Sequence, residues 1–493
     1  MSDSINLYNR EQVYQLDKLA MSLDAQSSQQ LMGRAAQACW NEILLRQPQI
    51  RRIVVFAGSG NNGGDGFALA MLALRDGYEV DCLIVSALEK QSTAAAFYRQ
   101  QYEQLGGNIQ IFSGRIPDCD VIVDGLLGIG LQRDLDQSWQ ALIEQINAHN
   151  AMCVALDIPS GLNADTGIAQ PVAVKADLTV TFIARKIGCF HMDGPHYCGE
   201  VLLDELGLSR AAASKIAPVV SALSATQIEL PQRPRNAHKN SFGHVLVIGG
   251  APGMSGAVRL AAKAALRSGA GLVSACVHAD CVQIVATAQA EVMVSDWSHI
   301  DAMLERASVV VVGPGLGDAK AAQQILQKLT SCELPMVIDA DALQRDFLQK
   351  LSSQETVLTP HPGEAARLLN SKSRAIQSDR LESLRHLLKQ FDSTVILKGA
   401  GSLIGSADLL PRLCLHGHSG MATAGMGDVL AGIAGGYLAQ GLNAAQAAQT
   451  AVLVHALAAE IFATEQDTAS LIASDVIDRI GKVVGRIRQE QCA

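Results

Sequence analysis

Residues 51–66 read RRIVVFAGSGNNGGDG, a short apolar run that ends in a glycine-rich turn. An uninterrupted apolar run of this length predicts a strand that is buried on both faces. The apolar stretch Phe67–Arg75 follows at once and predicts a helix. A strand, a glycine turn and a helix in this order are typical of a parallel, doubly wound α/β sheet.

The same alternation continues on both sides of this unit. Residues 10–48 predict helices, and strands are expected at 80–85, 121–124, 152–157 and 178–182. The pattern breaks around residues 204–240, where a helix at 211–215 is followed by the linker-like stretch 230–236. A second strand and glycine turn then open at 244–250, with further strands expected at 272–277, 309–312, 336–339, 356–359 and 394–398. The sequence therefore predicts two three-layer αβα domains.

Composition narrows the class of protein. A chain of 493 residues is too long for one core, and its net charge of −9 argues against nucleic acid and anionic membranes as partners. Eleven scattered cysteines without a C-x-x-C pair indicate reduced thiols, and residues 1–6 lack a signal-peptide pattern, so a cytoplasmic location is expected. The uncharged run 429–459 is interrupted by glycines and polar residues, which predicts two buried helices and not a membrane span.

The first glycine turn is a candidate binding site. It matches neither the G-x-G-x-x-G fingerprint nor a Walker A loop, but it offers free backbone N–H groups at a strand end. Asp124 and Asp157 end two later strands and should reach the same edge of the sheet. Their oxygens suit a small cation, and a carboxylate in a cleft suits proton transfer. Each aspartate taken alone would be a strand-end cap more often than a catalytic residue.

Gly425–Asp428 forms a second candidate, because a glycine turn here leads directly into the helix expected from Val429. A helix N-terminus with free N–H groups favours an anion. Asp428 would repel a phosphate unless it accepts a proton as a phosphoryl group arrives, although a simple helix cap is the alternative. Lys398 with the following glycines, and strand ends at 313–317, 339–341 and 359–364, complete a set suited to phosphoryl transfer.

The first half resembles a known family. The motifs N-N-G-G-D-G (61–66), D-x-x-x-G-x-G (124–130) and D-I-P-S-G (157–161) are similar to the N-terminal domain of bacterial bifunctional NAD(P)H-hydrate repair enzymes, a Rossmann-like NAD(P)H-hydrate epimerase. The resemblance implies that Asp157 lies at the reacting ring, and we expect it to be the acid–base residue. Lys186 is either a second polar group of this site or, equally, a solvated lysine after a strand. The resemblance implies K⁺ ligands at Asn62, Asp124 and Ser160. It implies that the hydrate contacts Asn61, Asn62, Gly63, Gly64, Asp65, Gly128, Ile129, Gly130, Leu131, Gln132, Arg133, Asp134 and Asp157.

The second half resembles the ADP-dependent NAD(P)H-hydrate dehydratases, which are ribokinase-like. The motifs are H-K-x-x-F-G-H-V-L-V-I-G-G (238–250), T-P-H-P-G-E (359–364), K-G-A-G (398–401) and G-M-x-T-x-G-x-G-D-V-L (420–430). The resemblance implies Asp428 as the catalytic residue, Mg²⁺ and ADP. The implied hydrate contacts are Ala257, Gly315, Gly317, His361 and Asp428, and the implied nucleotide contacts are Lys398, Gly399, Ala400, Gly401, Ser402 and Gly427. Met426 stands where many ribokinase-like proteins have a small residue.

Together these resemblances imply an epimerase domain over 1–215, a linker over 216–240 and a dehydratase domain over 241–493. The expected substrates are NADH hydrate, NADPH hydrate and ADP, and a homo-oligomer is expected. A small-molecule kinase fused to a dinucleotide-sensing domain is the main alternative. A non-catalytic sensor and an NAD-dependent dehydrogenase are the others, and the missing dinucleotide fingerprint disfavours the dehydrogenase.

Overall fold

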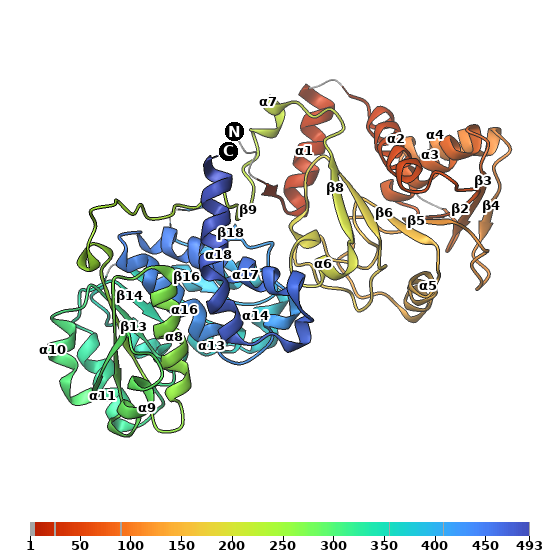
Figure 1. The fold of residues 1–493 in the computed structure, drawn as a ribbon. Coiled ribbons are helices and arrows are strands. Elements are labelled where there is room, and N and C mark those ends of the chain that lie inside the picture. Colours follow the sequence, from red (N-terminus) through yellow and green to blue (C-terminus); the bar gives the residue numbers. More distant parts are fainter. Residues whose placement is uncertain (1–4, 24–25, 89–90, 354, 408, 493) are drawn as a thin grey trace. The chain divides into compact units, whose positions relative to one another are not determined.

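The computed structural model describes residues 5–23, 26–88, 91–353, 355–407 and 409–492 (Figure 1). The chain divides into an N-terminal unit, Asn6–Val220, and a C-terminal unit, Ser221–Ala493 together with Met1–Ile5. Each unit is a mainly parallel sheet covered by helices, which confirms the expected fold class.

The N-terminal unit is built on seven parallel strands in the order β4-β3-β2-β5-β6-β7-β8. The strands are β2 (Arg52–Ala57), β3 (Glu79–Ile84), β4 (Ile109–Ile111), β5 (Val121–Gly125), β6 (Met152–Leu156), β7 (Leu178–Phe182) and β8 (Glu200–Asp204), and β1 (Asn6–Leu7) precedes them. The helices are α1 (Arg10–Leu23), α2 (Ser28–Arg46), α3 (Asn61–Arg75), α4 (Thr93–Gln104), α5 (Gln137–Asn147), the 3₁₀ turn η1 (Ile187–Cys189), α6 (Gly194–Tyr197) and α7 (Arg210–Ala213).

Strand β2 shows why this sheet has helices on both faces. Ile53 and Val55 pack with α1–α4 in one hydrophobic cluster, whereas Val54 and Phe56 pack with α5 in another. Alternate side chains of a strand point to opposite faces, so a strand that is apolar throughout needs cover on both. This is the three-layer arrangement that the apolar run predicted.

The C-terminal unit has the strand order β9-β18-β17-β16-β15-β14-β13-β10-β11-β12, parallel from β12 to β16, with β17 antiparallel to both of its neighbours. The strands are β9 (Val220–Ala222), β10 (His244–Ile248), β11 (Leu272–Val277), β12 (Val292–Asp296), β13 (Val309–Val312), β14 (Met336–Ile338), β15 (Thr356–Leu358), β16 (Thr394–Leu397), β17 (Leu403–Gly405) and β18 (Arg412–Leu413). The α-helices are α8 (Ser255–Ser268), α9 (Val282–Ala286), α10 (Ile300–Leu304), α11 (Lys320–Leu329), α12 (Arg345–Leu348), α13 (Pro362–Leu368), α14 (Ser373–Ser378), α15 (Arg380–Gln390), α16 (Met426–Ala439), α17 (Ala444–Glu465) and α18 (Ala473–Cys492). The 3₁₀ turns are η2 (Lys239–Phe242), η3 (Ala279–Cys281), η4 (Trp297–His299), η5 (Ala340–Ala342), η6 (Ser419–Met421) and η7 (Thr468–Ser470).

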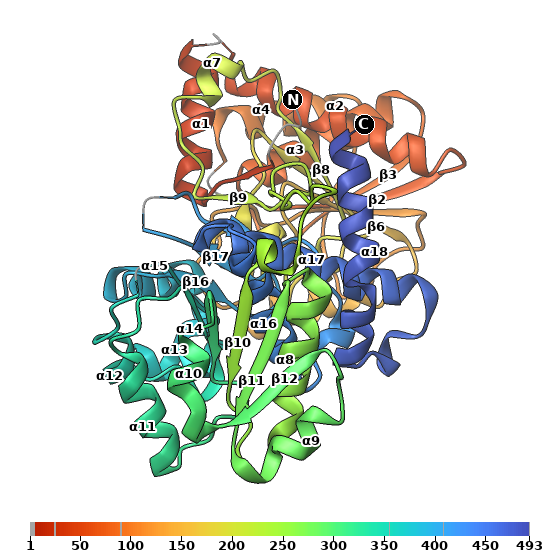
Figure 2. The ribbon, with the colours of Figure 1, turned by 60° about the vertical axis from the view of Figure 1, so that its left-hand side comes forward.

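Helices α8, α16, α17 and α18 form one layer of this unit. Figure 2 shows α8 and α16 side by side against the strands, although they lie far apart in the sequence. Glycine at 432 permits the close approach, because a Cβ there would lie 2.2 Å from the carbonyl oxygen of Ala261 in α8. Helix α17 is the one helix of the described chain that is long and apolar enough to cross a membrane, but it is mostly buried. The uncharged run is therefore two core helices, as predicted.

The structure differs from the predicted elements at several places. Helix α3 begins at Asn61 and not at Phe67, since the N–H of Gly64 already donates to the carbonyl of Gly60 at 3.2 Å. The sequence pattern missed β1, β4, β8, β9, β12, β17 and β18, which are short or lie toward a sheet edge. The linker-like stretch 230–236 packs on the C-terminal unit, where the guanidinium of Arg233 lies 4.0 Å from the ring centre of Phe242.

Candidate functional sites

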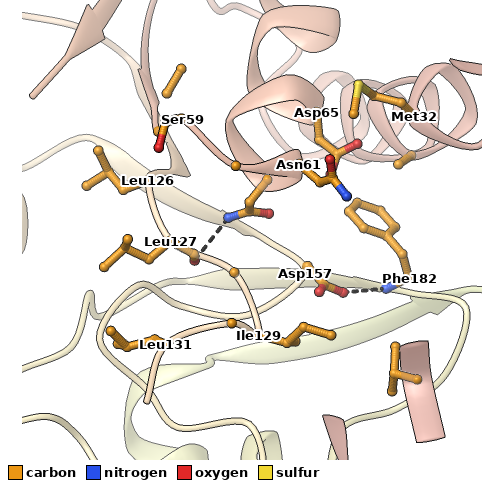
Figure 3. A pocket seen from close by; sticks show the side chains of 18 of the residues that line it. Met32, Ser59, Asn61, Asp65, Leu126, Leu127, Ile129, Leu131, Asp157 and Phe182 are labelled. Atoms are coloured by element: carbon orange, nitrogen blue, oxygen red, sulfur yellow. Dashed lines mark hydrogen bonds between the residues drawn. The ribbon is translucent and has the colours of Figure 1, made fainter. Parts of the chain in front are cut away.

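A cavity of about 890 Å³ lies at the carboxyl ends of β2, β5 and β6 (Figure 3). The chain leaves β2 for β3 on one side and later returns to β5 on the other. Connections that diverge in this way leave a crevice at which open α/β sheets bind ligands. The cavity wall contains these predicted residues: Asn61, Asn62, Asp65, Gly128, Ile129, Gly130, Leu131, Gln132, Arg133, Asp134 and Asp157.

Two predicted binding residues, Gly63 and Gly64, are buried behind this wall. A Cβ at Gly63 would lie 1.9 Å from the carbonyl oxygen of Gly58, and one at Gly64 would lie 2.6 Å from Met32. Their missing side chains let α3 start directly against the turn. Within the described residues, the N–H groups of the first helical residues, 61–63, donate no hydrogen bond. They form the positive end of the helix, which favours an anionic group.

Asp157 follows β6 in a left-handed conformation with φ of 67°. Such a conformation costs a non-glycine residue about 1–3 kcal/mol and is often found at functional sites. Oδ1 of Asp157 accepts hydrogen bonds from the N–H of Phe182, at 3.1 Å, and from the ammonium of Lys186. Lys186 is fully buried and also donates to the carbonyl of Phe182 at 2.7 Å. These contacts fix Oδ1, and Oδ2 makes no hydrogen bond to the residues that the structure describes.

Asp124 and Ser160 are hydrogen-bonded to each other, and Asn62 and Ser160 both contact the backbone of Leu127. The fully buried carboxylate of Asp124 accepts hydrogen bonds from the N–H and Oγ of Ser160, at 2.7 and 2.6 Å, and from the N–H of Leu126 at 3.2 Å. Burial raises its pKa to about 6, although these hydrogen bonds oppose the rise. Asn62 donates to the carbonyl of Leu127 at 3.1 Å, while its Oδ1 is buried and has no partner among the described residues. An unpaired amide oxygen and a buried carboxylate are ligand types that suit a small cation.

Sequence reasoning missed Tyr14 and Asp17, which line the same cavity from α1. Burial raises the pKa of Asp17 to about 6, against the opposing effect of Lys186 and with a contribution from Asp157. Burial, together with Asp157 and Asp17, raises the pKa of Asp65 well above its ordinary value. The spacing of Tyr14 and Asp17 on an amphipathic helix carried no signal of this role, because polar residues on such a helix usually face solvent.

The second site lies where β14 and β16 end and α16 begins. The ammonium of Lys398 lies 2.7 Å from Oδ1 of Asp339 and 3.7 Å from Oε2 of Glu364. Burial lowers the pKa of Lys398, but these two carboxylates outweigh it and raise the pKa. Gly427 leaves room for the lysine, since a Cβ there would lie 3.2 Å from its Nζ. Lys398 is therefore a charged group held beside the first turn of α16.

Asp428 stands in that first turn of α16. Burial raises its pKa to about 7, with Asp339, Asp341 and Glu364 adding to the rise and Lys398 opposing it. The alternative role as a helix cap is wrong, because the N-cap is Gly425, with φ of 87°. A carboxylate with this pKa can accept a proton near neutral pH.

Met426 does not face this site. Its side chain is 7% exposed and belongs to the hydrophobic core cluster of the C-terminal unit. The larger residue at this position therefore adds to the core and leaves the start of α16 free.

Three predicted hydrate contacts cluster near the end of β13. A Cβ at Gly315 would lie 3.3 Å from Cβ of Ala257, so these two residues are neighbours. The N–H of Gly317 donates to Oδ2 of Asp341 at 2.8 Å, which holds the turn. Gly317 and Asp341 also line a cavity of about 350 Å³, together with Arg345 and Arg367.

His361 is placed by α13, of which it is the N-cap. Its Nδ1 accepts hydrogen bonds from the N–H groups of Gly363 and Glu364, at 2.9 and 3.3 Å. The backbone N–H of His361 in turn donates to Oε2 of Glu364 at 2.7 Å. This capping box fixes the imidazole, whose side chain remains 54% exposed.

Each half of the chain matches the profile of a known protein family. The profile of the family described as NAD(P)H-hydrate dehydratase matches residues 245–482. The profile described as YjeF-related protein N-terminus matches residues 28–188.

Curated proteins match along nearly the whole chain. The bifunctional NAD(P)H-hydrate repair enzyme Nnr of Coxiella burnetii is 40% identical over 486 residues, which cover 97% of this chain and 99% of that protein. The Escherichia coli protein of the same name is 37% identical and covers 92% of this chain and 89% of its own length. Among solved structures, the ADP/ATP-dependent NAD(P)H-hydrate dehydratase of Bacillus subtilis, co-crystallised with ATP and Mg²⁺, is 27% identical with a TM-score of 0.50 and covers 53% of this chain and 96% of its own.

Proposed function

The chain belongs to the family of bifunctional NAD(P)H-hydrate repair enzymes, and we propose that it carries out both reactions of that family. The N-terminal unit interconverts the R and S forms of NADH hydrate and NADPH hydrate. The C-terminal unit dehydrates the S form to NAD(P)H and consumes ADP, giving AMP and phosphate. The observation that carries the proposal is the position of Asp428, with a pKa of about 7, beside Lys398 at the start of α16.

In the epimerase site, Asp157 is the proposed acid–base residue. Epimerisation requires that the oxygen at C6 leaves and returns beside the ring nitrogen, which can stabilise the cationic carbon. A carboxylate that gives and takes back one proton is sufficient for this exchange. The pairing with Lys186 holds Oδ1, so that Oδ2 is the oxygen available to the substrate. The N–H groups at the start of α3 suit the phosphates of the dinucleotide.

We propose that Asn62, Asp124 and Ser160 bind K⁺ below this cavity. The unpaired Oδ1 of Asn62 and the buried carboxylate of Asp124 support the assignment. A bound cation would balance the charge of Asp124 and hold the turn after β5 against α3. Replacing Asn62 with Leu should then weaken K⁺ binding, measured directly by isothermal titration.

In the dehydratase site, Asp428 takes the proton from the C6 hydroxyl of the S hydrate as that oxygen attacks the terminal phosphorus of ADP. The bond from that phosphorus to its bridging oxygen breaks and AMP leaves. The ring nitrogen then supplies the electron pair that expels phosphate from C6, and loss of the C5 proton gives NAD(P)H. Lys398 balances the charge of the phosphoryl group during transfer.

Mg²⁺ is proposed to enter with the nucleotide. In the ranges of the chain that the structure describes, no group of three or more His, Cys, Asp or Glu side chains could hold a metal ion. We expect phosphate oxygens and water to bind Mg²⁺, which is its usual mode in phosphoryl-transfer sites. The charge of Mg²⁺ would neutralise the phosphates.

Three further expectations remain part of this proposal. They are the domain limits 1–215 and 241–493 with a linker at 216–240, a homo-oligomeric state and a cytoplasmic location.

One experiment tests the whole proposal. The chain is mixed with a mixture of R and S hydrate, Mg²⁺ and either ADP or ATP, and the absorbance of the reduced nicotinamide is followed. We expect all of the hydrate to be converted with ADP, together with equimolar AMP and phosphate. A stable phosphorylated product without any NAD(P)H would favour the alternative, a small-molecule kinase with a dinucleotide-sensing domain.

A further inference from the structure

Arg380, the first residue of α15, is a buried cation that contacts the loop between β16 and β17. It is only 1% exposed. Its guanidinium donates hydrogen bonds to the carbonyl oxygens of Leu397 at 3.0 Å, Lys398 at 3.2 Å and Gly401 at 3.1 Å. It also donates to Oε1 of Gln377 at 3.3 Å. Three carbonyl groups, one at the end of β16 and two in the loop that follows it, therefore converge on a single side chain.

This convergence determines where the N–H groups of the loop point. In a trans peptide the C=O and the following N–H are antiparallel. Because the carbonyl of Lys398 points at Arg380, the N–H of Gly399 points away from it. The same holds for the carbonyl of Gly401 and the N–H of Ser402. The guanidinium therefore binds the carbonyl groups on one side of the loop, and the N–H groups of Gly399 and Ser402 point to the opposite side.

These donors are free. Within the described parts of the chain, the N–H groups of residues 399–402 donate no hydrogen bond. Successive free N–H groups in a glycine turn form a concave site that binds phosphate oxygens. The loop and the arginine also fit closely, since a Cβ at Gly399 would lie 2.0 Å from a guanidinium nitrogen of Arg380. A glycine is therefore required here for the arginine to reach the carbonyl groups.

The charge of Arg380 adds to this effect. Burial lowers its pKa to about 10, so that the guanidinium stays protonated at neutral pH. No carboxylate forms an ion pair with it among the residues that the structure describes, and its hydrogen bonds go to neutral oxygens. A full positive charge without a counter-ion therefore lies behind the loop. It would attract a phosphate that binds on the other side of the loop.

We propose that Arg380 is the positioning residue of the nucleotide loop, which it holds so that the N–H groups of residues 399–402 face the terminal phosphates of ADP. This inference rests on the proposed dehydratase function. Arg380 touches no substrate and acts only through the loop. A lysine would keep the charge but could not bind three carbonyl groups in one plane.

The test uses the full-length chain with Arg380→Lys and Arg380→Met, with ADP binding measured by isothermal titration. We expect the Kd for ADP to rise by about 10- to 100-fold in both, the same order as the loss of metal affinity when the hydrogen-bond partner of a metal ligand is removed. The KM for ADP should rise while the KM for the hydrate stays within about twofold, and added guanidinium should restore part of the affinity of Arg380→Met. Arg412→Met is the matched control, because Arg412 is a partly buried arginine of the same unit that donates to Oγ of Ser221 at 2.9 Å and to Oε1 of Gln227 at 3.4 Å. Among the described residues its side chain makes no hydrogen bond to residues 397–402. This variant should bind ADP as the wild type does.

Wild-type ADP affinity in both Arg380 variants would overturn the inference, and so would an equal loss of ADP and hydrate binding without rescue by guanidinium. If the variants do not fold, hydrogen–deuterium exchange of the wild-type chain decides. Exchange at residues 399–402 should slow when ADP is added, and unchanged exchange despite ADP binding would refute the role. Failure of the proposed function itself is distinguishable, because the wild-type chain would then form no NAD(P)H with ADP.

Discussion

At the scale of single residues, the proposed chemistry depends on carboxylates whose pKa lies near neutral pH. Asp428 is the clearest case, since burial and three neighbouring carboxylates raise its pKa to about 7. We expect Asp428→Asn to lower the rate of dehydration by about 10²–10⁴-fold, because the amide cannot accept the hydroxyl proton. The readout is NAD(P)H absorbance with ADP and Mg²⁺. Epimer interconversion in the same sample is the control and should be unchanged. Dehydration within tenfold of wild type would exclude Asp428 as the base.

The pH dependence follows from the same group. Asp428 must be ionised to accept a proton, so kcat/KM for dehydration should rise with pH through about 7 and then level off. Asp341 adds to the raised pKa of Asp428 as a like charge. Asp341→Asn should therefore move the midpoint to lower pH, while its remaining oxygen can still accept the N–H of Gly317. A midpoint that stays in place, or that moves to higher pH, contradicts this assignment.

The sequence could predict those site residues that belong to a glycine motif. Lys398 and Asp428 stand next to glycines whose role can be inferred from the sequence. The structure brings the two residues close together, at Gly427. Asp17 and Arg380 could not be predicted. Each is a charged residue on an amphipathic helix, a place where solvent exposure is the ordinary outcome. Only the fold shows that Asp17 lines the first cavity and that Arg380 is buried.

At the scale of helices and strands, the sequence predicted buried strands more accurately than exposed ones. The expectation for β7, at 178–182, and for β11, at 272–277, is confirmed to the residue, because both are mainly apolar strands whose side chains are almost all buried. Strand β4 has only three residues, two of them exposed, and leaves no periodic pattern to detect. The start of α3 at Asn61 was missed because Gly63 and Gly64 disfavour a helix by propensity, whereas here they serve close packing.

The contact of α8 with α16 offers a test with a matched pair of glycines. A methyl group at Gly432 would collide with the carbonyl of Ala261, 2.2 Å away, whereas Gly481 in α18 has nothing within 4 Å of the same position. Gly432→Ala should lower the free energy of unfolding of the C-terminal unit by about 1–3 kcal/mol, the usual cost of overpacking. Gly481→Ala should raise it by about 0.5–1 kcal/mol, because alanine favours a helix. Thermal unfolding measures both. Equal shifts in both variants would show that the helices do not pack this closely.

At the scale of the whole molecule, two units with separate cores carry two steps of one repair. The dehydratase is proposed to accept only the S hydrate, so the epimerase must supply it from the R form. The cavity of about 890 Å³ lies entirely within residues of the N-terminal unit, and Asp428 lies in the C-terminal unit. Each activity should therefore work without the other, complete conversion of an R and S mixture should need both, and the intermediate should be able to pass through solution.

This separation can be tested with Asp157→Asn. The variant should lose epimerisation, because the amide cannot transfer the proton at C6. With an R and S mixture, ADP and Mg²⁺, NAD(P)H formation should then stop when the S hydrate is consumed, after correction for interconversion without enzyme. Adding Asp428→Asn, which is inactive in dehydration, should restore complete conversion, since its intact epimerase supplies S hydrate to the other chain. If the mixture also stops early while each variant keeps its own remaining activity, the S hydrate does not leave the chain on which it forms, and the two sites must exchange it directly.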